Sequence, residues 1–393
     1  MNIDYLKLLE SYLLTVILAL PLRNKIVKPS DFLGVVFLAA AIIPTLSFYA
    51  LNSKERLFMY YMAIAYLIVI YSARLFPGIR FRYIKQGNKI MIFFGSLLVL
   101  FVLALMIKNG GLNYFNLDLT RVYEYRGEVS RVINMGILGY LNTWVFKVIN
   151  PALMVWALLR NKKKLLILFI SIQVLFFGIS SHKSVLFYPF LILGVYYLFN
   201  SRYYKKITSY MFLGLSFLVI ICGLFAIWWE QIWPATLFIR RVFYVPALLN
   251  FTYYEVFSQL GHVYLSNSIF ALLVDYPFSY DYTRIISLHL FGHPNTNCNN
   301  GFLATSYMHF GLGGVVVYSV IVGLLLWMVD SLSFKRLPVW VAISISIVPF
   351  FSLFTSADLT TALLTHGIMV VLILLWLLGR KENKTVIEGD KLE

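Results

Sequence analysis

Charged residues are scarce in this sequence. Only 13% of the 393 residues are charged, whereas 60% are hydrophobic, and this balance excludes an ordinary soluble protein. The apolar runs reach the roughly 20 residues that cross about 30 Å of hydrocarbon. The composition therefore predicts an all-α, polytopic integral membrane protein.

Cysteine is almost absent, and the histidines lack a metal-ligand spacing. Cys222 lies in an apolar run and Cys298 in a polar segment, so no disulfide framework or metal motif emerges. His289 and His293 are four residues apart, but Gly292 and Pro294 spoil a helical pair of ligands. We therefore expect neither a metal nor another cofactor.

Acidic residues are few, and the formal net charge is +16. In a soluble protein this excess would suggest nucleic acid. Here the basic residues gather in short segments between apolar runs, which is typical of cytoplasmic loops. The charge therefore indicates topology, and we expect no nucleic-acid partner.

Apolar segments predict eleven membrane-spanning helices. They cover 5–21, 32–51, 57–75, 90–107, 141–159, 165–180, 184–199, 208–229, 302–329, 339–354 and 363–378. The first segment lacks a basic region and a cleavage site, so we interpret it as a retained span, or alternatively as an interfacial helix. No internal repeat is present, and we interpret residues 1–393 as a single transmembrane domain with a disordered cytoplasmic tail over 380–393.

The basic residues set the orientation, because the side that carries most of them is cytoplasmic. These are Arg23, Lys25, Lys28, Arg74, Arg80, Arg82, Lys85, Lys89, Arg160, Lys162, Lys163, Lys164, Arg202, Lys205, Lys206, Lys335, Arg336, Arg380, Lys381, Lys384 and Lys391. Two long extracytoplasmic loops remain, 108–140 and 230–301. All six histidines then fall on the outer side, namely His182, His262, His289, His293, His309 and His366. The active face is therefore predicted to be extracytoplasmic.

The first outer loop carries three arginines, Arg121, Arg126 and Arg131, with Glu124 and Glu128 between them. On a helix these charges pair with one another, which gives a self-paired interfacial helix. Alternatively the arginines form an anion clamp, because guanidinium groups donate bidentate hydrogen bonds to phosphate.

The second outer loop contains Arg240 and Arg241 within an apolar and aromatic stretch. Charges so close to lipid need an anionic partner. A lipid-linked pyrophosphate, a phospholipid headgroup or a local carboxylate such as Glu230 or Glu255 would supply one.

Arg284, His289 and His293 follow in the same loop, near Asp275 and Asp281. A neutral imidazole accepts a proton from a hydroxyl nucleophile, and an arginine stabilises a leaving phosphate. These three residues are therefore catalytic candidates, although a histidine is more often a structural hydrogen-bonding group.

An amide-rich run then leads into the next span. Its asparagines, which suit sugar hydroxyls at a helix entrance, are Asn295, Asn297, Asn299 and Asn300. Gly311, Gly313 and Gly314 follow and permit close packing in the membrane.

This pattern resembles the Wzy-type O-antigen or capsule repeat-unit polymerases, which are related in architecture to O-antigen ligases. The resemblance rests on the asparagine-rich run, the Gly301-Phe-Leu sequence and the Gly-x-Gly-Gly helix after a long basic outer loop. It covers the architecture of most of the chain, and the motif covers residues 284–314.

The resemblance implies a GT-C class, metal-independent inverting glycosyltransferase in the bacterial cytoplasmic (inner) membrane. Its substrates would be undecaprenyl-pyrophosphate-linked oligosaccharides, and further partners a chain-length regulator and a flippase. Arg121, Arg126, Arg240 and Arg241 would hold the pyrophosphate. Arg284, His289 and His293 would be catalytic, with His293 as the base.

Three other functions compete with this interpretation. One is a structural membrane scaffold, and the many polar residues of one outer loop count against it. An O-antigen ligase would use the same donor with lipid A core as the acceptor. A flippase or transporter would line its path with charges inside the spans, where this sequence has mainly Lys147 and Asp330.

Overall fold

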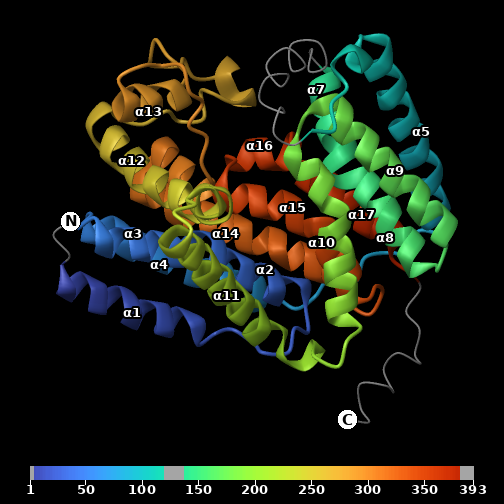
Figure 1. The fold of residues 1–393 in the computed structure, drawn as a ribbon, viewed down its shortest axis with the longest axis horizontal. Helices are drawn as coiled ribbons and strands as arrows, with labels where there is room; N and C mark the ends of the chain where they lie inside the picture. Colours follow the sequence, from blue (N-terminus) through green and yellow to red (C-terminus); the bar gives the residue numbers. More distant parts are fainter. Residues whose placement is uncertain (1–3, 119–136, 381–393) are drawn as a thin grey trace. The chain divides into compact units, whose positions relative to one another are not determined.

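The computed structural model describes residues 4–118 and 137–380, and this part of the chain is helical, without a β-strand (Figure 1). Its α-helices are α1 (Tyr5–Ala19), α2 (Pro29–Phe37), α3 (Ile43–Leu51), α4 (Arg56–Leu75), α5 (Gly87–Lys108), α7 (Ile137–Trp144), α8 (Asn150–Leu159), α9 (Lys163–Ser180), α10 (Lys183–Phe199), α11 (Ile207–Trp228), α12 (Val245–Leu260), α13 (Tyr282–Phe291), α14 (Phe302–Ser333), α15 (Val339–Thr355), α16 (Leu359–Leu364) and α17 (Ile368–Leu378). Short π-helical segments are η1 (Leu38–Ile42), η3 (Val145–Ile149) and η5 (Ala235–Tyr244), and 3-10 turns are η2 (Gly111–Tyr114), η4 (Tyr204–Lys206) and η6 (Ile269–Leu272).

Within the described ranges, eight helical stretches are long and apolar enough to cross a membrane. They are Pro29–Leu51, Arg56–Leu75, Gly87–Lys108, Ile137–Leu159, Lys163–Ser180, Tyr204–Trp228, Phe302–Ser333 and Leu359–Leu378. The prediction of an all-α, polytopic membrane protein is confirmed at this level. Each of the eleven predicted segments overlaps a helix, whereas their number as crossings stays a prediction.

The chain forms two compact units, each built from separate stretches of sequence. Unit 1 comprises 1–77, 205–327 and 350–362, and unit 2 comprises 78–204, 328–349 and 363–393. Helices α14, α15 and α16 each contribute residues to both units. The predicted tail lies outside the described residues apart from Arg380.

Unit 1 is centred on an aromatic cluster around Phe37 of α2. Its ring lies 4.6 Å from that of Phe354, 5.5 Å from that of Phe302 and 5.7 Å from that of Tyr66. These rings are almost completely buried. Their burial fixes the start of α14 and the end of α15 against α2 and α4, and these two helix ends frame the polar residues discussed below.

Helix α1 lies along α3 and α4 in Figure 1. Its Glu10 accepts a hydrogen bond from the Tyr49 hydroxyl at 2.6 Å and one from Arg56 Nε at 3.1 Å. With 15 residues, α1 spans about 22 Å, which is less than the roughly 30 Å of a hydrocarbon core. Its length therefore favours the interfacial alternative for the first apolar segment.

The segment 230–301, predicted as an outer loop, contains a buried helix. Helix α12 packs on α3 and α4, and Phe251 of α12 meets the rings of Phe48 at 5.9 Å and Phe58 at 5.4 Å. Its 16 residues are fewer than a membrane crossing requires. A search for crossing-length apolar runs therefore does not detect it.

Each π-helical segment ends one residue before an X-Pro step. The prolines Pro44, Pro151 and Pro246 occupy the second position of α3, α8 and α12. Proline cannot donate a backbone hydrogen bond, and its ring collides with the carbonyl four residues earlier. A widened turn before the proline relieves this collision, so each of these three π-helical segments has a local cause in the sequence.

Unit 2 contains a buried amide pair that joins four helical elements. Asn150 Nδ2 donates to Gln173 Oε1 at 2.6 Å, and Gln173 Nε2 donates to the carbonyls of Phe146 at 2.8 Å and Val185 at 3.2 Å. Such polar contacts bind helices together where no water competes for them. They fix η3 and α8 against α9 and α10, which lie side by side in Figure 1.

Candidate functional site

The catalytic residues predicted from the sequence lie on α13 and the turn that follows it. Asp281 caps the helix, because its Oδ1 accepts hydrogen bonds from the Thr283 N–H at 2.9 Å and the Thr283 hydroxyl at 2.6 Å. Gly292 ends the helix with φ +73°, a left-handed conformation that favours glycine. The chain therefore reverses immediately before His293.

Ser287 and Arg284 hold this reversed segment against α13. The Ser287 hydroxyl donates to the carbonyl of His293 at 2.7 Å and accepts from the Thr296 N–H at 3.3 Å. Arg284 Nη1 donates to the carbonyl of Pro294 at 3.0 Å. The structure thus brings the guanidinium of Arg284 to the residue next to His293, and both side chains are exposed.

His289 lies in the last turn of α13 and is exposed, and so are Asn295, Asn297 and Asn299. Asn300 is different. It is 1% exposed, and its amide donates to Asn250 Oδ1 at 2.9 Å and to the carbonyl of Pro246 at 3.2 Å. Of the four predicted sugar-binding asparagines, three are accessible, and the fourth joins the start of α12 to the start of α14.

The polar run is anchored into unit 1 next to Asn300. The Tyr253 hydroxyl donates to the carbonyl of Cys298 at 2.8 Å, and a Cβ at Gly301 would lie 2.3 Å from the carbonyl oxygen of Phe354. Only glycine permits this approach. Burial raises the pKa of the Cys298 thiol despite its contact with Ser287, so the thiol is not activated as a nucleophile.

The predicted pyrophosphate-binding arginines fall in two groups. Arg240 and Arg241 are exposed near the end of η5, shortly before Pro246. Trp228, Trp229 and Trp233 precede them and are also exposed, as expected for side chains at a membrane surface.

The other predicted pyrophosphate ligands, Arg121 and Arg126, lie outside the described residues. Together with Arg131, Glu124 and Glu128 they fall in the stretch 119–136.

A buried histidine and aspartate face each other in unit 1, and the sequence analysis did not pair them. His309 Nε2 lies 3.5 Å from Asp358 Oδ1, and the two side chains are 0% and 1% exposed. His309 Nδ1 accepts from the Leu265 N–H at 3.1 Å, so in the neutral ring the proton resides on Nε2 and points toward Asp358.

Asp358 remains ionised in this setting. Burial by itself would raise the pKa of its carboxyl group, but the hydrogen-bonding groups of His309, Thr360 and Thr305 outweigh burial, and the pKa is lowered. Thr360 contributes a hydroxyl that donates to Asp358 Oδ2 at 2.7 Å.

Helix α14 breaks immediately after His309. Phe310 and Gly311 have non-helical backbones, and Gly311 has φ +63° and ψ −152°. A Cβ at Gly311 would lie 3.0 Å from His262 Nε2. The glycine that the sequence analysis assigned to close packing is therefore the point where the helix bends around His262.

Unit 2 holds a second polar pair, between Lys147 and His366. Lys147 Nζ lies 2.7 Å from His366 Nδ1, and Trp144 Nε1 donates to the carbonyl of Leu364 on the same two segments. Lys147 is one of the two charges that the sequence placed inside a span. Its place in a π-helical turn before Pro151 turns it toward the break between α16 and α17.

Among the residues that the structure describes, no three histidine, cysteine, aspartate or glutamate side chains are grouped to hold a metal ion. By the length and composition of its helices, the chain is a multi-pass α-helical membrane protein. Comparison with protein-family models, with curated proteins and with solved structures gives no match to this chain. The resemblance to repeat-unit polymerases therefore stays a prediction from the sequence.

Proposed function

We propose that this protein polymerises undecaprenyl-pyrophosphate-linked oligosaccharide repeat units of an O-antigen or capsule. The proposed reaction is a GT-C class, metal-independent inverting glycosyl transfer. It would take place on the extracytoplasmic face of a bacterial cytoplasmic membrane. Membrane lipids surround the enzyme, and a flippase and a chain-length regulator would be its partners.

The observation that carries the proposal is the turn after α13. It joins an exposed guanidinium, that of Arg284, to the segment that bears an exposed imidazole, that of His293, through one hydrogen bond to Pro294. Glycosyl transfer from a pyrophosphate needs a cation for the leaving group and a base for the attacking hydroxyl. Both groups are accessible here and both are held on one short, hydrogen-bonded segment.

The reaction that these groups would perform is a single displacement. The acceptor sugar hydroxyl attacks the anomeric carbon of the growing chain, and a new C–O bond forms as the bond from that carbon to the pyrophosphate oxygen breaks. His293 takes the hydroxyl proton. Undecaprenyl pyrophosphate leaves with the bonding electron pair, and the charge that develops on it is stabilised by Arg284.

The remaining candidates have supporting roles in this proposal. Arg240 and Arg241 would hold the pyrophosphate next to the membrane surface, together with Arg121 and Arg126. His289 would assist at the end of α13. Asn295, Asn297 and Asn299 suit the sugar, because their side chains are exposed beside His293, whereas the contacts of Asn300 support a structural role.

The test measures chain extension by the purified protein. Lipid-linked repeat units are supplied in the presence of a metal chelator, and the products are read as a ladder on a gel. His293→Ala is expected to lower the rate by about 10²- to 10⁴-fold and Arg284→Ala by about 10²- to 10³-fold. Tyr280→Phe is the matched control, since it removes one exposed hydroxyl just before α13.

Three outcomes would count against this proposal. An unchanged ladder from both variants would remove these residues from the mechanism. A wild-type ladder that needs added divalent metal would contradict the metal-independent reaction. Transfer only to an added lipid A core acceptor, without a ladder, would identify a ligase.

A further inference from the structure

His262 of unit 1 takes no part in the proposed reaction. It follows α12 at Gly261, which has φ +88° and ends the helix. Its ring lies edge-on to the rings of Tyr307 at 5.7 Å and Tyr264 at 6.0 Å. The bend of α14 makes room for this ring, since a Cβ at Gly311 would lie 3.0 Å from His262 Nε2. The end of α12 and the bend of α14 therefore meet around one imidazole.

The segment that carries His262 is fixed to α14 through its main chain. The N–H groups of Val263 and Tyr264 donate to carbonyl groups of α14 at 3.0 and 3.3 Å. Tyr264 and Leu265 have φ +49° and +65°, a left-handed conformation that residues other than glycine adopt at a cost. The ring of Tyr264, which is 52% exposed, is thus held in an imposed position, as backbone strain often does at ligand sites.

The imidazole of His262 has hydrogen-bonding capacity that the protein does not use. Among the described residues neither ring nitrogen has a hydrogen-bond partner, and Nδ1 is buried. An N–H buried without an acceptor is unfavourable, so in the neutral ring the proton resides on Nε2. His262 therefore offers a ligand one hydrogen-bond donor, at Nε2.

Aromatic rings continue the surface beside His262. The ring of Tyr254 lies 4.9 Å from that of Tyr307, and the ring of Phe310, which is 41% exposed, lies 6.0 Å from that of Tyr264. The face of an aromatic ring is electron-rich, so the carbon-bound hydrogens of a sugar ring stack on it. We refer to Tyr254, His262, Tyr264, Tyr307 and Phe310 together as the aromatic cluster.

The charges next to the aromatic cluster are acidic or paired. Burial first, and then the carboxylate of Glu55 at the start of α4, raise the pKa of the Tyr254 phenol. Lys54 Nζ lies 2.7 Å from Glu255 Oε1 and is paired with it. A phosphate would therefore meet a carboxylate here, whereas a sugar hydroxyl can donate to that carboxylate and accept from His262 Nε2.

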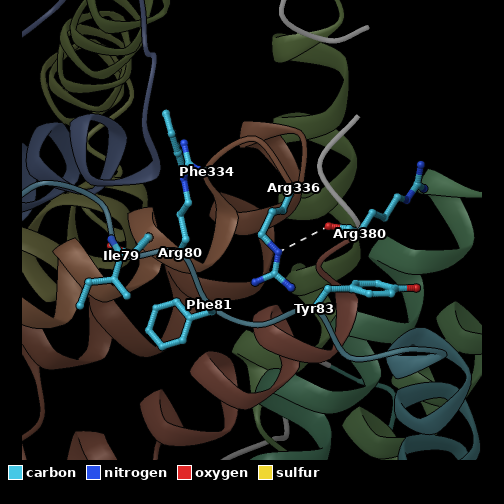
Figure 2. A pocket seen from close by; sticks show the side chains of 8 residues that line it. Ile79, Arg80, Phe81, Tyr83, Phe334, Arg336 and Arg380 are labelled. Carbon is cyan, nitrogen blue, oxygen red and sulfur yellow. Dashed lines mark hydrogen bonds between the residues drawn. The ribbon is translucent and has the colours of Figure 1, made fainter. Parts of the chain in front are cut away.

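A cavity of unit 2 shows the opposite charge (Figure 2). Its charged lining residues are Arg80, Arg336 and Arg380, and Arg336 Nε points to the Arg380 carbonyl at 3.5 Å. The polar groups of the aromatic cluster are instead phenols and an imidazole. The two groupings therefore differ in charge, and a ligand without charge fits the aromatic cluster.

We propose that the aromatic cluster binds an uncharged sugar of the acceptor repeat unit. The ring of Tyr264 stacks on the sugar, Phe310 lies against its edge, and His262 Nε2 donates to a sugar oxygen. This proposal rests on the proposed polymerase function, which supplies the acceptor. Helix α12 joins the cluster to the α13 turn, because the Tyr253 hydroxyl donates to the Cys298 carbonyl at 2.8 Å and the next residue along α12 belongs to the cluster.

The test uses the full-length protein in lipid nanodiscs and two probes. One is the oligosaccharide of a single repeat unit, freed from its lipid, and the other is undecaprenyl pyrophosphate without sugar. Saturation-transfer NMR measures binding of the oligosaccharide and identifies the sugar protons that lie against the protein, and native mass spectrometry measures binding of the lipid. Chain extension is measured on the same preparations with lipid-linked repeat units.

Tyr264→Ala is expected to weaken oligosaccharide binding about tenfold, through the loss of one stacked ring, and to leave binding of undecaprenyl pyrophosphate unchanged. Phe310→Ala removes the second exposed ring and tests the site even where Tyr264→Ala fails to fold. His262→Phe keeps a ring and removes the donor, so we expect a loss of about fivefold. In chain extension each variant should raise the KM for the lipid-linked unit by a similar factor and leave kcat little changed.

The matched control is Tyr280→Ala, which removes a ring that is 49% exposed from the same predicted outer loop, outside the aromatic cluster. It should bind the oligosaccharide like the wild type. Oligosaccharide binding that depends on Tyr264 without a ladder would support the site and contradict the polymerase. A ladder without oligosaccharide binding, unchanged binding in Tyr264→Ala and Phe310→Ala, or an equal loss in Tyr280→Ala would each overturn the site and leave the polymerase standing.

Discussion

Two histidines of unit 1 have opposite surroundings. His293 follows α13 in an exposed turn, where its main-chain carbonyl is hydrogen-bonded and its ring stacks on Phe291 at 5.9 Å. His309 is completely buried in α14, where one ring nitrogen accepts from the backbone and the other faces Asp358. The ring of His293 is exposed although its Nδ1 accepts from the Asn295 N–H at 3.4 Å, whereas the ring of His309 is buried with one nitrogen on the backbone and the other 3.5 Å from Asp358 Oδ1.

This difference shows why residue type does not assign a role. Both side chains are imidazoles, and both stand in the same part of the sequence. Only the exposed one is accessible from outside the fold, which a base must be to contact a substrate hydroxyl. The buried one instead stabilises the bend in α14 and fixes the charge of Asp358.

The largest effect on stability is expected from His309→Ala. It would leave the Leu265 N–H and the Asp358 carboxylate buried without this partner, and we expect a loss of about 3–5 kcal/mol. His293→Ala, at an exposed position, should change stability by about 0.5 kcal/mol or less. Unfolding of both variants in detergent measures the contrast, and equal losses would break the comparison.

Asp358→Asn tests whether the buried pair of His309 and Asp358 makes stability depend on pH. We expect it to lose about 1–3 kcal/mol at neutral pH, because an ionised acceptor is replaced. The folded-state pKa of Asp358 is lowered, so its contribution is complete above the unfolded value of about 3.9 and is lost as the pH falls through the folded value.

The wild-type advantage over Asp358→Asn should therefore shrink on acidification below about pH 4. Melting temperatures of both proteins across this range provide the measurement. A constant difference down to the lowest pH would show that the charge of Asp358 contributes nothing to stability.

Gly311→Ala tests the bend itself, with an expected loss no larger than that of Asp358→Asn. The backbone of Gly311 lies in a region that only glycine adopts readily, and a Cβ there would also press on His262. We therefore expect a loss of stability of about 1–3 kcal/mol. The loss is near the lower end of this range if His262 shifts. Gly313→Ala is the control, because a Cβ there meets nothing within 4 Å. It should be neutral or stabilise α14. Equal effects would mean that the bend stores no strain.

Most of the helices could be predicted from the sequence. A membrane-spanning helix requires a long apolar run, and such a run is recognised from the residues of that segment alone. The predicted spans 90–107 and 165–180 coincide with α5 and α9 to within a few residues. Helix α12 was missed, since its 16 residues include Asn250 and Glu255 and its burial depends on α3 and α4.

The candidate site was predictable only in part. The stretch 284–293 gathers one arginine and two histidines, and the structure brings Arg284 to the residue beside His293 through the turn at Gly292. Nothing in the local sequence distinguishes Asn299, which is exposed, from Asn300, which is buried. Their difference arises from contacts with residues some fifty positions away, at Pro246 and Asn250.

The sequence alone determined that the chain is helical and that it belongs in a membrane. These properties follow from local chemistry, because apolar side chains partition into lipid. Only the tertiary structure decided which polar groups are exposed and which are paired, as in His293 and His309 or Lys147 and His366. The physical reason is that the role of a polar group in a helical bundle depends on the group it is paired with, and these partners come from distant parts of the chain.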